Sequence, residues 1–403
     1  MRRVIPISAI LVLVVFMTAP VSSRTAELED TVALKGATVY TAVGPAISNA
    51  VILVQNGKIT AVGRDVAIPD GVRIIDVSGK EVIPGLIDEH SHIGGYTDVN
   101  EYTMPLGPEN RAIDALNLSV EDWDEAMKAG VTTVITGPGS GERMGGQSVT
   151  IKTWGKDLNK RILKETKEAK MAVNARDLSH IPAIRKMFIK AKEYKEKWEK
   201  FEGGDKKGPA PDRDVASEAL VPVLKGEEKL RVHIHFANDM MTFLKLKDEF
   251  GFDLTFIHSS ESYKVADEIA KRKVPVIMLP LATRIAVDEG MLFGIKKLYD
   301  AGVKVALHTD HPVVHQKLLR INAAMAIRYG VPEDAALQMV TINPAVSSKI
   351  AGRVGSIETG KDADLVVLNG TWFEPRTRVD MVFVDGLLSY DRIKDDRGLR
   401  EVD

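Results

Sequence analysis

Residues 82–92 read VIPGLIDEHSH, an apolar segment interrupted by Pro-Gly that ends in a His-x-His pair. Residues at positions i and i+2 of a strand share one face. The side chains of His90 and His92 can therefore converge on one ion at the end of this strand. A lone His-x-His pair is a weak signal, because two solvated histidines give the same pattern. Its place at the end of an apolar strand strengthens the case for a metal site.

Seven further apolar, β-like runs follow this first one and alternate with helical stretches. They span residues 130–136, 148–153, 170–174, 230–236, 253–258, 274–280 and 303–309. Eight strands with helical crossovers fit a (β/α)8 barrel of roughly 250 residues. The sequence therefore predicts an α/β fold in which residues 85–352 form a TIM-type barrel.

The segments on either side of this barrel have a different sequence pattern, with short runs typical of β-strands. Residues 25–84 contain short runs rich in β-branched residues, with a strong hairpin signal at Asn56-Gly57. Residues 353–403 again contain runs typical of β-strands, DADLVVLNG and VDMVFVDG. These two segments predict a small β-sandwich into which the barrel is inserted in the sequence.

Residues 1–24 are not expected to belong to the fold. Arg2 and Arg3 precede an uncharged segment, residues 4–23, that contains ILVLVVFM and ends in small and polar residues. This is the pattern of a signal peptide, which predicts a secreted or periplasmic protein. An uncleaved membrane anchor is the alternative, because an uncharged segment of this length could just span a bilayer.

Composition excludes several classes of function. The chain has 54 Lys and Arg against 56 Asp and Glu, so no basic excess is available for a nucleic-acid backbone. It has no cysteine, which excludes disulfides, cysteine-bound zinc, iron–sulfur clusters and thiol catalysis. Any metal site must use histidine and carboxylate ligands, and we expect a small-molecule substrate. A homo-oligomer is compatible with the sequence.

Histidines gather at the ends of four predicted strands. Seven of the nine histidines occupy these ends: His90, His92, His233, His235, His258, His308 and His311. In barrel enzymes the active site forms at the C-terminal ends of the strands, and neutral imidazole is the commonest transition-metal ligand. Asp310, among these histidines, can bind a metal, accept a proton, or both. The pattern predicts a metal-dependent active site.

The motifs GLIDEHSH, VHIH, FIH and HTDHP, in this order, resemble the amidohydrolase superfamily. The flanking segments agree, since ALKGATVYT resembles its N-terminal β layer and TINPAVSSKIAGRVGSIETGKDADLVVLNG its C-terminal signature. The resemblance covers residues 30–390. Within the superfamily, the chain is most similar to imidazolonepropionase-related proteins and exported Xaa-dipeptidases.

The resemblance implies a role for each candidate residue. The metal ligands would be His90, His92, His233, His258 and Asp310, for zinc or another divalent transition metal. Asp310 would also act as the general base, and His258 could stabilise the developing oxyanion. The substrate-facing side chains would be His235, His308 and His311, with His235 as second choice for the fifth-strand ligand.

The resemblance leaves the number of metal ions open. Binuclear relatives carry a carboxylated lysine on the fourth strand, which bridges two ions. Lys170 stands at that place, and Lys152 is a weaker candidate. A surface position at the start of the strand is the alternative for Lys170.

Two departures from relatives argue against deaminase activity and against imidazolonepropionase activity. Phe236 stands three residues after His233, where deaminase relatives are expected to carry Glu, and His233-Ile-His235 replaces the His-Ala-Glu of imidazolonepropionase. The resemblance then implies hydrolysis of a C–N bond in a dipeptide or cyclic amide by a zinc-activated water. A lactonase or esterase on the same site, and a non-catalytic exported binding protein, are the alternatives. The glycine-rich segment 137–146 is expected to shape the substrate site.

Overall fold

The computed structural model describes residues 31–95, 106–141, 143–155, 157–165, 168–173, 180–204, 208–281 and 289–395. The predicted signal peptide, residues 1–24, lies outside these residues. In the part of the chain that is described, no helix has the length and apolar character needed to cross a membrane.

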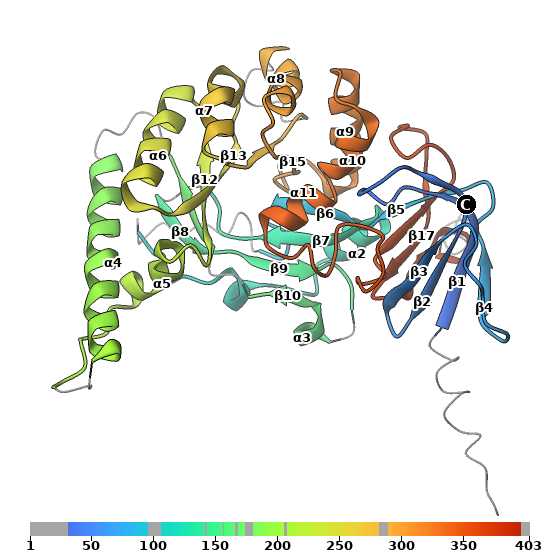
Figure 1. Cartoon of the computed structure of the whole chain (residues 1–403), viewed down its shortest axis with the longest axis horizontal. Coiled ribbons are helices and arrows are strands. Elements are labelled where there is room, and N and C mark those ends of the chain that lie inside the picture. The colour runs from blue at the N-terminus through green and yellow to red at the C-terminus, as the bar shows by residue number, and fades with distance from the viewer. Residues whose placement is uncertain are drawn as a thin grey trace, which may run out of the picture.

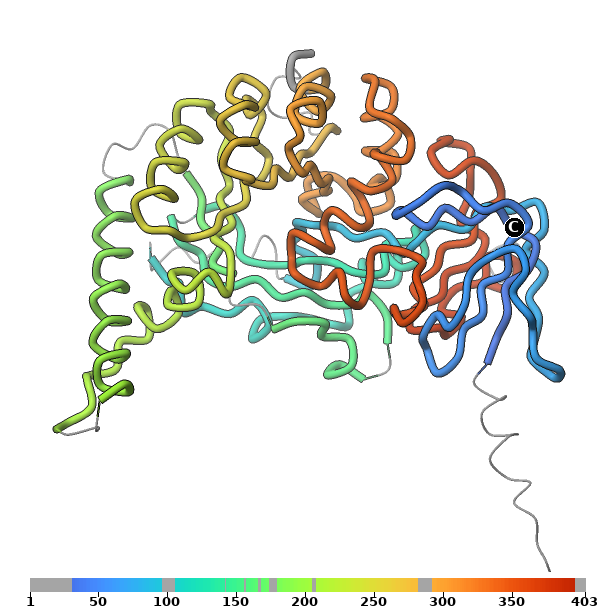
Figure 2. Tube along the Cα trace, in the orientation of Figure 1, coloured from blue at the N-terminus to red at the C-terminus, as the bar shows by residue number. Residues whose placement is uncertain are grey.

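Strands from both ends of the chain join in one eight-stranded sheet. The first part of the chain supplies β1 (Thr31–Val39), β2 (Ile47–Gln55), β3 (Lys58–Gly63), β4 (Arg73–Asp76) and β5 (Glu81–Pro84), and the last part supplies β16 (Leu365–Leu368), β17 (Val379–Val384) and β18 (Leu387–Asp391). The order is β18-β17-β16-β5-β1-β2-β3, with β4 paired to β1, and Figures 1 and 2 show the first strands (blue) beside the last ones (red). The predicted pairing of the chain ends is confirmed, but the hydrogen bonds form one sheet and do not show a sandwich of two.

The predicted hairpin turn lies between β2 and β3. Asn56 and Gly57 have φ of 51° and 76°, the left-handed pair that a two-residue hairpin uses. Gly57 also lies against the turn that joins β17 to β18, where an added Cβ would come within 2.8 Å of the Asp385 carbonyl oxygen. Glycine is therefore needed here both for the turn and for the close approach of two hairpins.

Ten further strands, with helices between many of them, lie in the sequence between the two parts of the terminal sheet. The strands are β6 (Leu86–Ser91), β7 (Val131–Thr136), β8 (Met144–Gln147), β9 (Val149–Lys152), β10 (Ile162–Lys164), β11 (Ala169–Ala172), β12 (Lys229–Ile234), β13 (Asp253–His258), β14 (Val276–Met278) and β15 (Val305–Leu307). They form two sheets, of order β10-β9-β7-β6 and β15-β14-β13-β12-β11-β8. The longer α-helices in the described residues are α2 (Asp122–Lys128), α4 (His180–Gly203), α5 (Val215–Leu224), α6 (Ala237–Phe250), α7 (Ala266–Lys271), α8 (Glu289–Asp300), α9 (Leu319–Arg328), α10 (Glu333–Gln338) and α11 (Ile342–Ser347), and α3 (Leu158–Arg161) and α12 (Arg392–Asp395) are shorter.

The large hydrophobic core lies between these strands and their covering helices. It includes Phe188 of α4, Phe243 of α6 and Phe256 of β13, all fully buried. Figure 1 shows α4 at the opposite end of the molecule from the terminal sheet, with α6 to α9 along one side. This core packs the central strands together, and the histidines lie at the carboxyl ends of these strands.

The predicted third barrel strand has the wrong direction. Residues 148–153 contain β9, which runs antiparallel to β7, and β8 runs antiparallel to β11. Consecutive parallel strands need a crossover of a dozen or more residues, usually a helix, and the segment between β7 and β9 contains β8 instead. Among the described strands between β5 and β16, the parallel ladders comprise β6, β7 and β11 to β15, so a closed barrel of eight parallel strands is not shown.

The first and last central strands nevertheless meet at their carboxyl ends. The amide of Asp310 donates a 3.0 Å hydrogen bond to the carbonyl oxygen of His90, and the amide of His92 donates one of 2.9 Å to that of His311. These bonds close the gap between β6 and β15 at the point where both strands end in histidines.

Lys152 joins β9 to the terminal sheet. Its fully buried Nζ lies 2.9 Å from carboxylate oxygens of Asp362 and Asp364 and 2.5 Å from one of Asp385. Burial alone would lower the pKa of Lys152, but the three carboxylates outweigh it and raise that pKa. Carboxylation by CO₂ requires a neutral amine, and none of these carboxylates belongs to the histidine cluster. Lys152 as a metal-bridging candidate is therefore wrong.

Candidate metal centre

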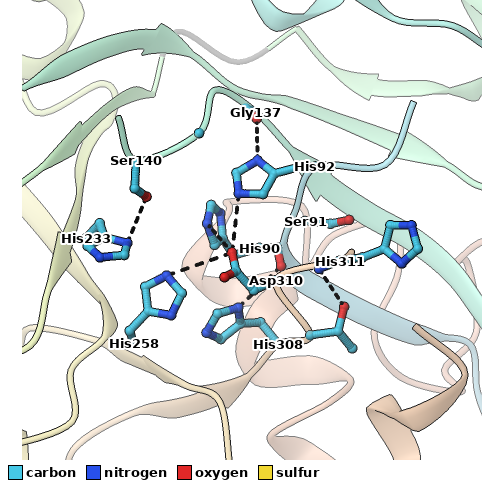
Figure 3. A network of polar contacts seen from close by, with 12 residues as sticks. His90, Ser91, His92, Gly137, Ser140, His233, His258, His308, Asp310 and His311 are labelled. Carbon is cyan, nitrogen blue, oxygen red and sulfur yellow. Dashed lines mark hydrogen bonds and ion pairs between the residues drawn. The ribbon is translucent and has the colours of Figure 1, made fainter. Parts of the chain in front are cut away.

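Three histidines from β6, the following segment and β13 surround the carboxylate of Asp310. Oδ1 of Asp310 lies 3.3 Å from Nε2 of His90, 3.3 Å from Nε2 of His92 and 3.9 Å from Nε2 of His258, as Figure 3 shows. Two ligand atoms bound about 2.0–2.1 Å from a tetrahedral zinc lie about 3.3–3.4 Å apart. The spacing of Asp310 from His90 and from His92 therefore fits a shared ion, and His258 lies slightly farther away.

Three buried imidazole nitrogens in this cluster lack a hydrogen bond, although two of them approach the carboxylate of Asp310. Nε2 of His90, His258 and His308 are buried, and none makes a hydrogen bond to any described residue. A buried polar atom left unpaired destabilises the fold. A cation between these rings and Asp310 would satisfy all three, so the residues present fit a metal ion.

Burial keeps four imidazoles at this site neutral. Burial is the main reason why the pKa values of His90, His233 and His258 lie well below that of free histidine. It lowers the pKa of His308 to about 4. A neutral imidazole is the form that binds a cation, so the cluster is in the binding-competent protonation state at neutral pH.

Asp310 keeps its negative charge despite burial. Burial alone would raise its pKa, but His258, His90 and His92 outweigh this effect and hold the pKa well below its usual range. Its backbone has φ of 54°, a left-handed conformation that turns the carboxylate sharply after β15. The site therefore combines neutral imidazoles with one ionised carboxylate.

Asp88 fixes the turn that carries Asp310. Its Oδ1 accepts a 3.0 Å hydrogen bond from the amide of Thr309, and its Oδ2 accepts one of 2.5 Å from the Thr309 hydroxyl and one of 3.2 Å from Gln316. Sequence reasoning missed Asp88. The available signal was an acid within the apolar strand two residues before His90.

The fifth-strand pair, His233 and His235, lies beside this cluster. Their Nε2 atoms are 3.0 Å apart, and the ring centroid of His233 is 4.2 Å from that of His258. The Nδ1 atoms are held by hydroxyls, that of His233 by Ser140 at 2.8 Å and that of His235 by Ser260 at 2.9 Å. Ligating histidines are commonly oriented in this way, and both rings meet that condition, so the choice between them stays open.

Lys170, on β11, is fully buried, so its surface alternative is wrong. Its Nζ donates a 3.1 Å hydrogen bond to Oγ of Ser140, which also contacts His233. Its charge helps to lower the pKa values of His90 and His233. Ser140 belongs to the glycine-rich segment 137–146, whose described residues thus contact the fourth- and fifth-strand candidates.

His308 and His311 occupy different surroundings. His308 is fully buried and its Nδ1 donates a 3.3 Å hydrogen bond to the carbonyl oxygen of His90, which leaves Nε2 directed to the group it forms with His258 and Asp310. Nε2 of His311 lies 3.1 Å from Asp122 of α2. The structure thus places His308 among the ligand candidates and His311 against α2. Their contact with a substrate stays a prediction.

The sequence profile of the amidohydrolase family matches residues 82–388, which contain every candidate ligand. The chain belongs to the amidohydrolase family. Proteins of this family generally bind divalent metals, and their structures imply a TIM-barrel-like fold of mixed α/β content for this amidohydrolase. The resemblance inferred from the motifs is thereby confirmed.

Individual relatives place the chain within the family. A crystal structure of an amidohydrolase from Thermotoga maritima MSB8 has a TM-score of 0.84 and 34% identity, covering 90% of this chain and 100% of that one. An imidazolonepropionase of Thermoplasma volcanium is 26% identical, covering 86% of this chain and 92% of the relative. Amidohydrolase tasK of Hapsidospora irregularis is also 26% identical, but the match spans 84% of this chain and only 40% of the length of tasK.

Proposed function

We propose that this amidohydrolase is a zinc-dependent hydrolase of a C–N bond in a small amide, either a dipeptide or a cyclic amide. The observation that carries the proposal is the approach of Oδ1 of Asp310 to Nε2 of both His90 and His92, at 3.3 Å each. The ionised carboxylate of Asp310 and the imidazoles around it provide both ligands for a divalent ion and a proton acceptor beside it.

The residues divide the chemistry between them. A bound zinc ion would supply activation of water and polarisation of the scissile carbonyl. Asp310 accepts the proton of the attacking water and delivers it to the leaving nitrogen, a general-base and general-acid role in sequence. His258, 3.9 Å from Asp310, either completes the ligand set or stabilises the negative charge that develops on the carbonyl oxygen.

The burial of Lys170 is an argument for a second metal ion at the site. A carboxylated lysine at this position would present oxygens beside His233, which Ser140 already holds together with Lys170. His308 adds one more ligand candidate, since its Nε2 shares a compact group with His258 and Asp310. We therefore propose one ion held by His90, His92 and Asp310, and a second that depends on carboxylation of Lys170.

Activity against a panel of substrates tests the proposal. The zinc-loaded full chain is assayed with dipeptides, N-acyl amino acids, cyclic amides and lactones, with the Asp310→Asn variant as the matched control. Metal-dependent amide cleavage that the variant lacks supports the proposal. Cleavage of lactones alone points to the esterase alternative, and no turnover of any substrate by a metal-loaded protein points to a binding protein.

We also propose that the protein is exported and acts outside the cytoplasm. The proposal is supported by the charged and then apolar pattern of residues 1–24. Export fits the scavenging of peptides or amides.

A further inference from the structure

A buried group of three ionisable residues lies next to the candidate ligands in sequence. Arg231 of β12, Glu89 of β6 and Glu168, just before β11, are each 1% exposed or less. Nη1 of Arg231 donates hydrogen bonds of 3.1 Å to Oε1 of Glu89 and 3.3 Å to Oε2 of Glu168. Nη2 of Arg231 donates to the backbone carbonyl oxygen of Glu89. We refer to Glu89, Glu168 and Arg231 as the buried triad.

Each member of the triad is one or two residues away from a candidate ligand on the same chain segment. Glu89 precedes His90, Glu168 comes two residues before Lys170, and Arg231 comes two residues before His233. In the parallel ladder of β11 with β12, Lys170 is the register partner of Arg231. The triad therefore sits directly beside the three segments that carry His90, Lys170 and His233.

Arg231 also connects two sheets that share no ladder. In the described strands, β6 belongs to the sheet of four and β11 and β12 belong to the sheet of six. The guanidinium on β12 reaches both the side chain and the main chain of Glu89 on β6. The hydroxyl of Ser348, at the end of α11, donates a further 3.2 Å bond to Glu89. The distance between β6 and β12 thus depends on this contact as well as on core packing.

The chemistry of arginine suits this task. Its planar fork presents several donors in a fixed geometry, whereas lysine offers a compact ammonium on a flexible stem. Buried ion groups of this kind seldom add stability over a well-packed apolar core. A role in setting geometry accounts for their presence at this place better than a role in stability.

We propose that Arg231, Glu89 and Glu168 are positioning residues, which set the spacing between the strand carrying His90 and the strands carrying Lys170 and His233. The inference rests on the proposed metal centre and deepens it. Outer-shell groups that orient metal ligands typically change metal affinity by about 10- to 100-fold when they are altered. The triad would act on that scale through the backbone of His90 and the separation of the strands.

The experiment compares Arg231→Lys and Glu168→Gln with the native full chain. Each protein is stripped of metal and titrated with Co²⁺ in competition with a chelator, and the visible absorption spectrum of the bound cobalt is recorded. Arg231→Lys keeps the charge but cannot reach all three oxygens. We expect its cobalt affinity to fall by about 10- to 100-fold with an altered spectrum, and Glu168→Gln to change both in the same direction by less.

Lys152→Arg is the matched control, because it exchanges one buried cation for another in a carboxylate cluster of the terminal sheet. We expect it to lower the unfolding temperature of the metal-free protein while leaving cobalt affinity and spectrum at native values. Native affinity and spectrum in both triad variants would overturn the inference and leave the proposed function intact. A native protein that takes up no cobalt would overturn the metal centre, and the inference with it.

Discussion

Asp310 and His90 are joined twice, by a 3.0 Å hydrogen bond from the amide of Asp310 to the carbonyl oxygen of His90 and by the 3.3 Å approach of the carboxylate to the imidazole. His90 belongs to β6, the first of the central strands, and Asp310 follows β15, the last of them. Because the backbone bond fixes the distance between the two side chains, an ion shared by them requires little rearrangement of the protein. The predictions below start from this contact.

The metal content of the protein should depend on the first-strand histidines. Elemental analysis of purified protein should show one to two equivalents of zinc or a similar metal, and the double variant His90→Ala, His92→Ala should lose most of it. His311→Ala is the control, because His311 contacts Asp122 of α2 and should leave the metal in place. Full retention of metal in the double variant would contradict the assignment of these ligands.

Asp310→Asn should separate metal binding from catalysis. The amide keeps the shape and an oxygen that can still ligate, but it loses the basicity needed to accept a proton. We expect a folded protein with much of its metal and a kcat reduced by about 10²- to 10⁴-fold. Steady-state kinetics on a substrate that the native protein cleaves provide the measurement. Near-native turnover would make the general-base role of Asp310 untenable.

Lys170 should determine whether one or two ions bind. If its amine is carboxylated, bicarbonate should speed the reconstitution of metal-free protein, and Lys170→Ala should bind about one metal equivalent less. The check is metal stoichiometry with and without bicarbonate. An unchanged stoichiometry would mean that Lys170 only supports Ser140, to which it donates a 3.1 Å hydrogen bond.

Asp380 should make the stability of the protein sensitive to acid. Burial would raise its pKa, but Lys80 and Arg392 outweigh burial and hold the pKa below its ordinary value. A depressed carboxyl pKa stabilises the fold above the unfolded pKa, about 3.9, and the stabilisation is lost as pH falls through the folded pKa. The free energy of unfolding of the native protein should exceed that of Asp380→Asn by a constant amount at neutral pH.

This difference between native protein and Asp380→Asn should shrink below about pH 4, where Asp380 becomes protonated in the unfolded chain. Urea denaturation of both proteins from neutral to acidic pH measures it. A difference that stays constant through the acidic range would contradict the assigned direction of the pKa shift.

The mature protein should lack its first segment. The pattern of residues 1–24 predicts an N-terminus between about residues 20 and 27 once the signal peptide is removed. Intact mass spectrometry of protein from its native host, in soluble and membrane fractions, gives the answer. Met1 retained in a membrane fraction would favour the anchor instead.

Local signals in the sequence identified one turn, the fold class and the family. Asn56-Gly57 identified a turn because a type I′ two-residue hairpin needs positive φ at both central residues, which Asn and Gly tolerate, and the structure has that backbone. The alternation of apolar runs with helical stretches identified the α/β class. The order of the histidine motifs identified the family, since each motif lies within a few consecutive residues.

Tertiary structure decided the direction of β9. It also decided which groups Lys152 and Lys170 contact. Both Lys152 and Lys170 lie in β-like runs, but Lys152 meets three carboxylates of the terminal segment and Lys170 meets Ser140 beside His233. Strand direction follows from the connection between strands and from pairing with distant partners. Neither is encoded in a short window of sequence.

The sequence by itself determined which residue types could serve a metal site and at which strand ends they stand. Only the tertiary structure decided which of them converge, that Asp88 holds the turn of Asp310, and that Arg231 ties β6 to β12. The physical reason is one of range. Strand periodicity and turn preference act over a few neighbouring residues, whereas a hydrogen bond or ion pair such as Arg231–Glu89 joins residues far apart in the chain and forms only when the whole fold brings them within about 3 Å.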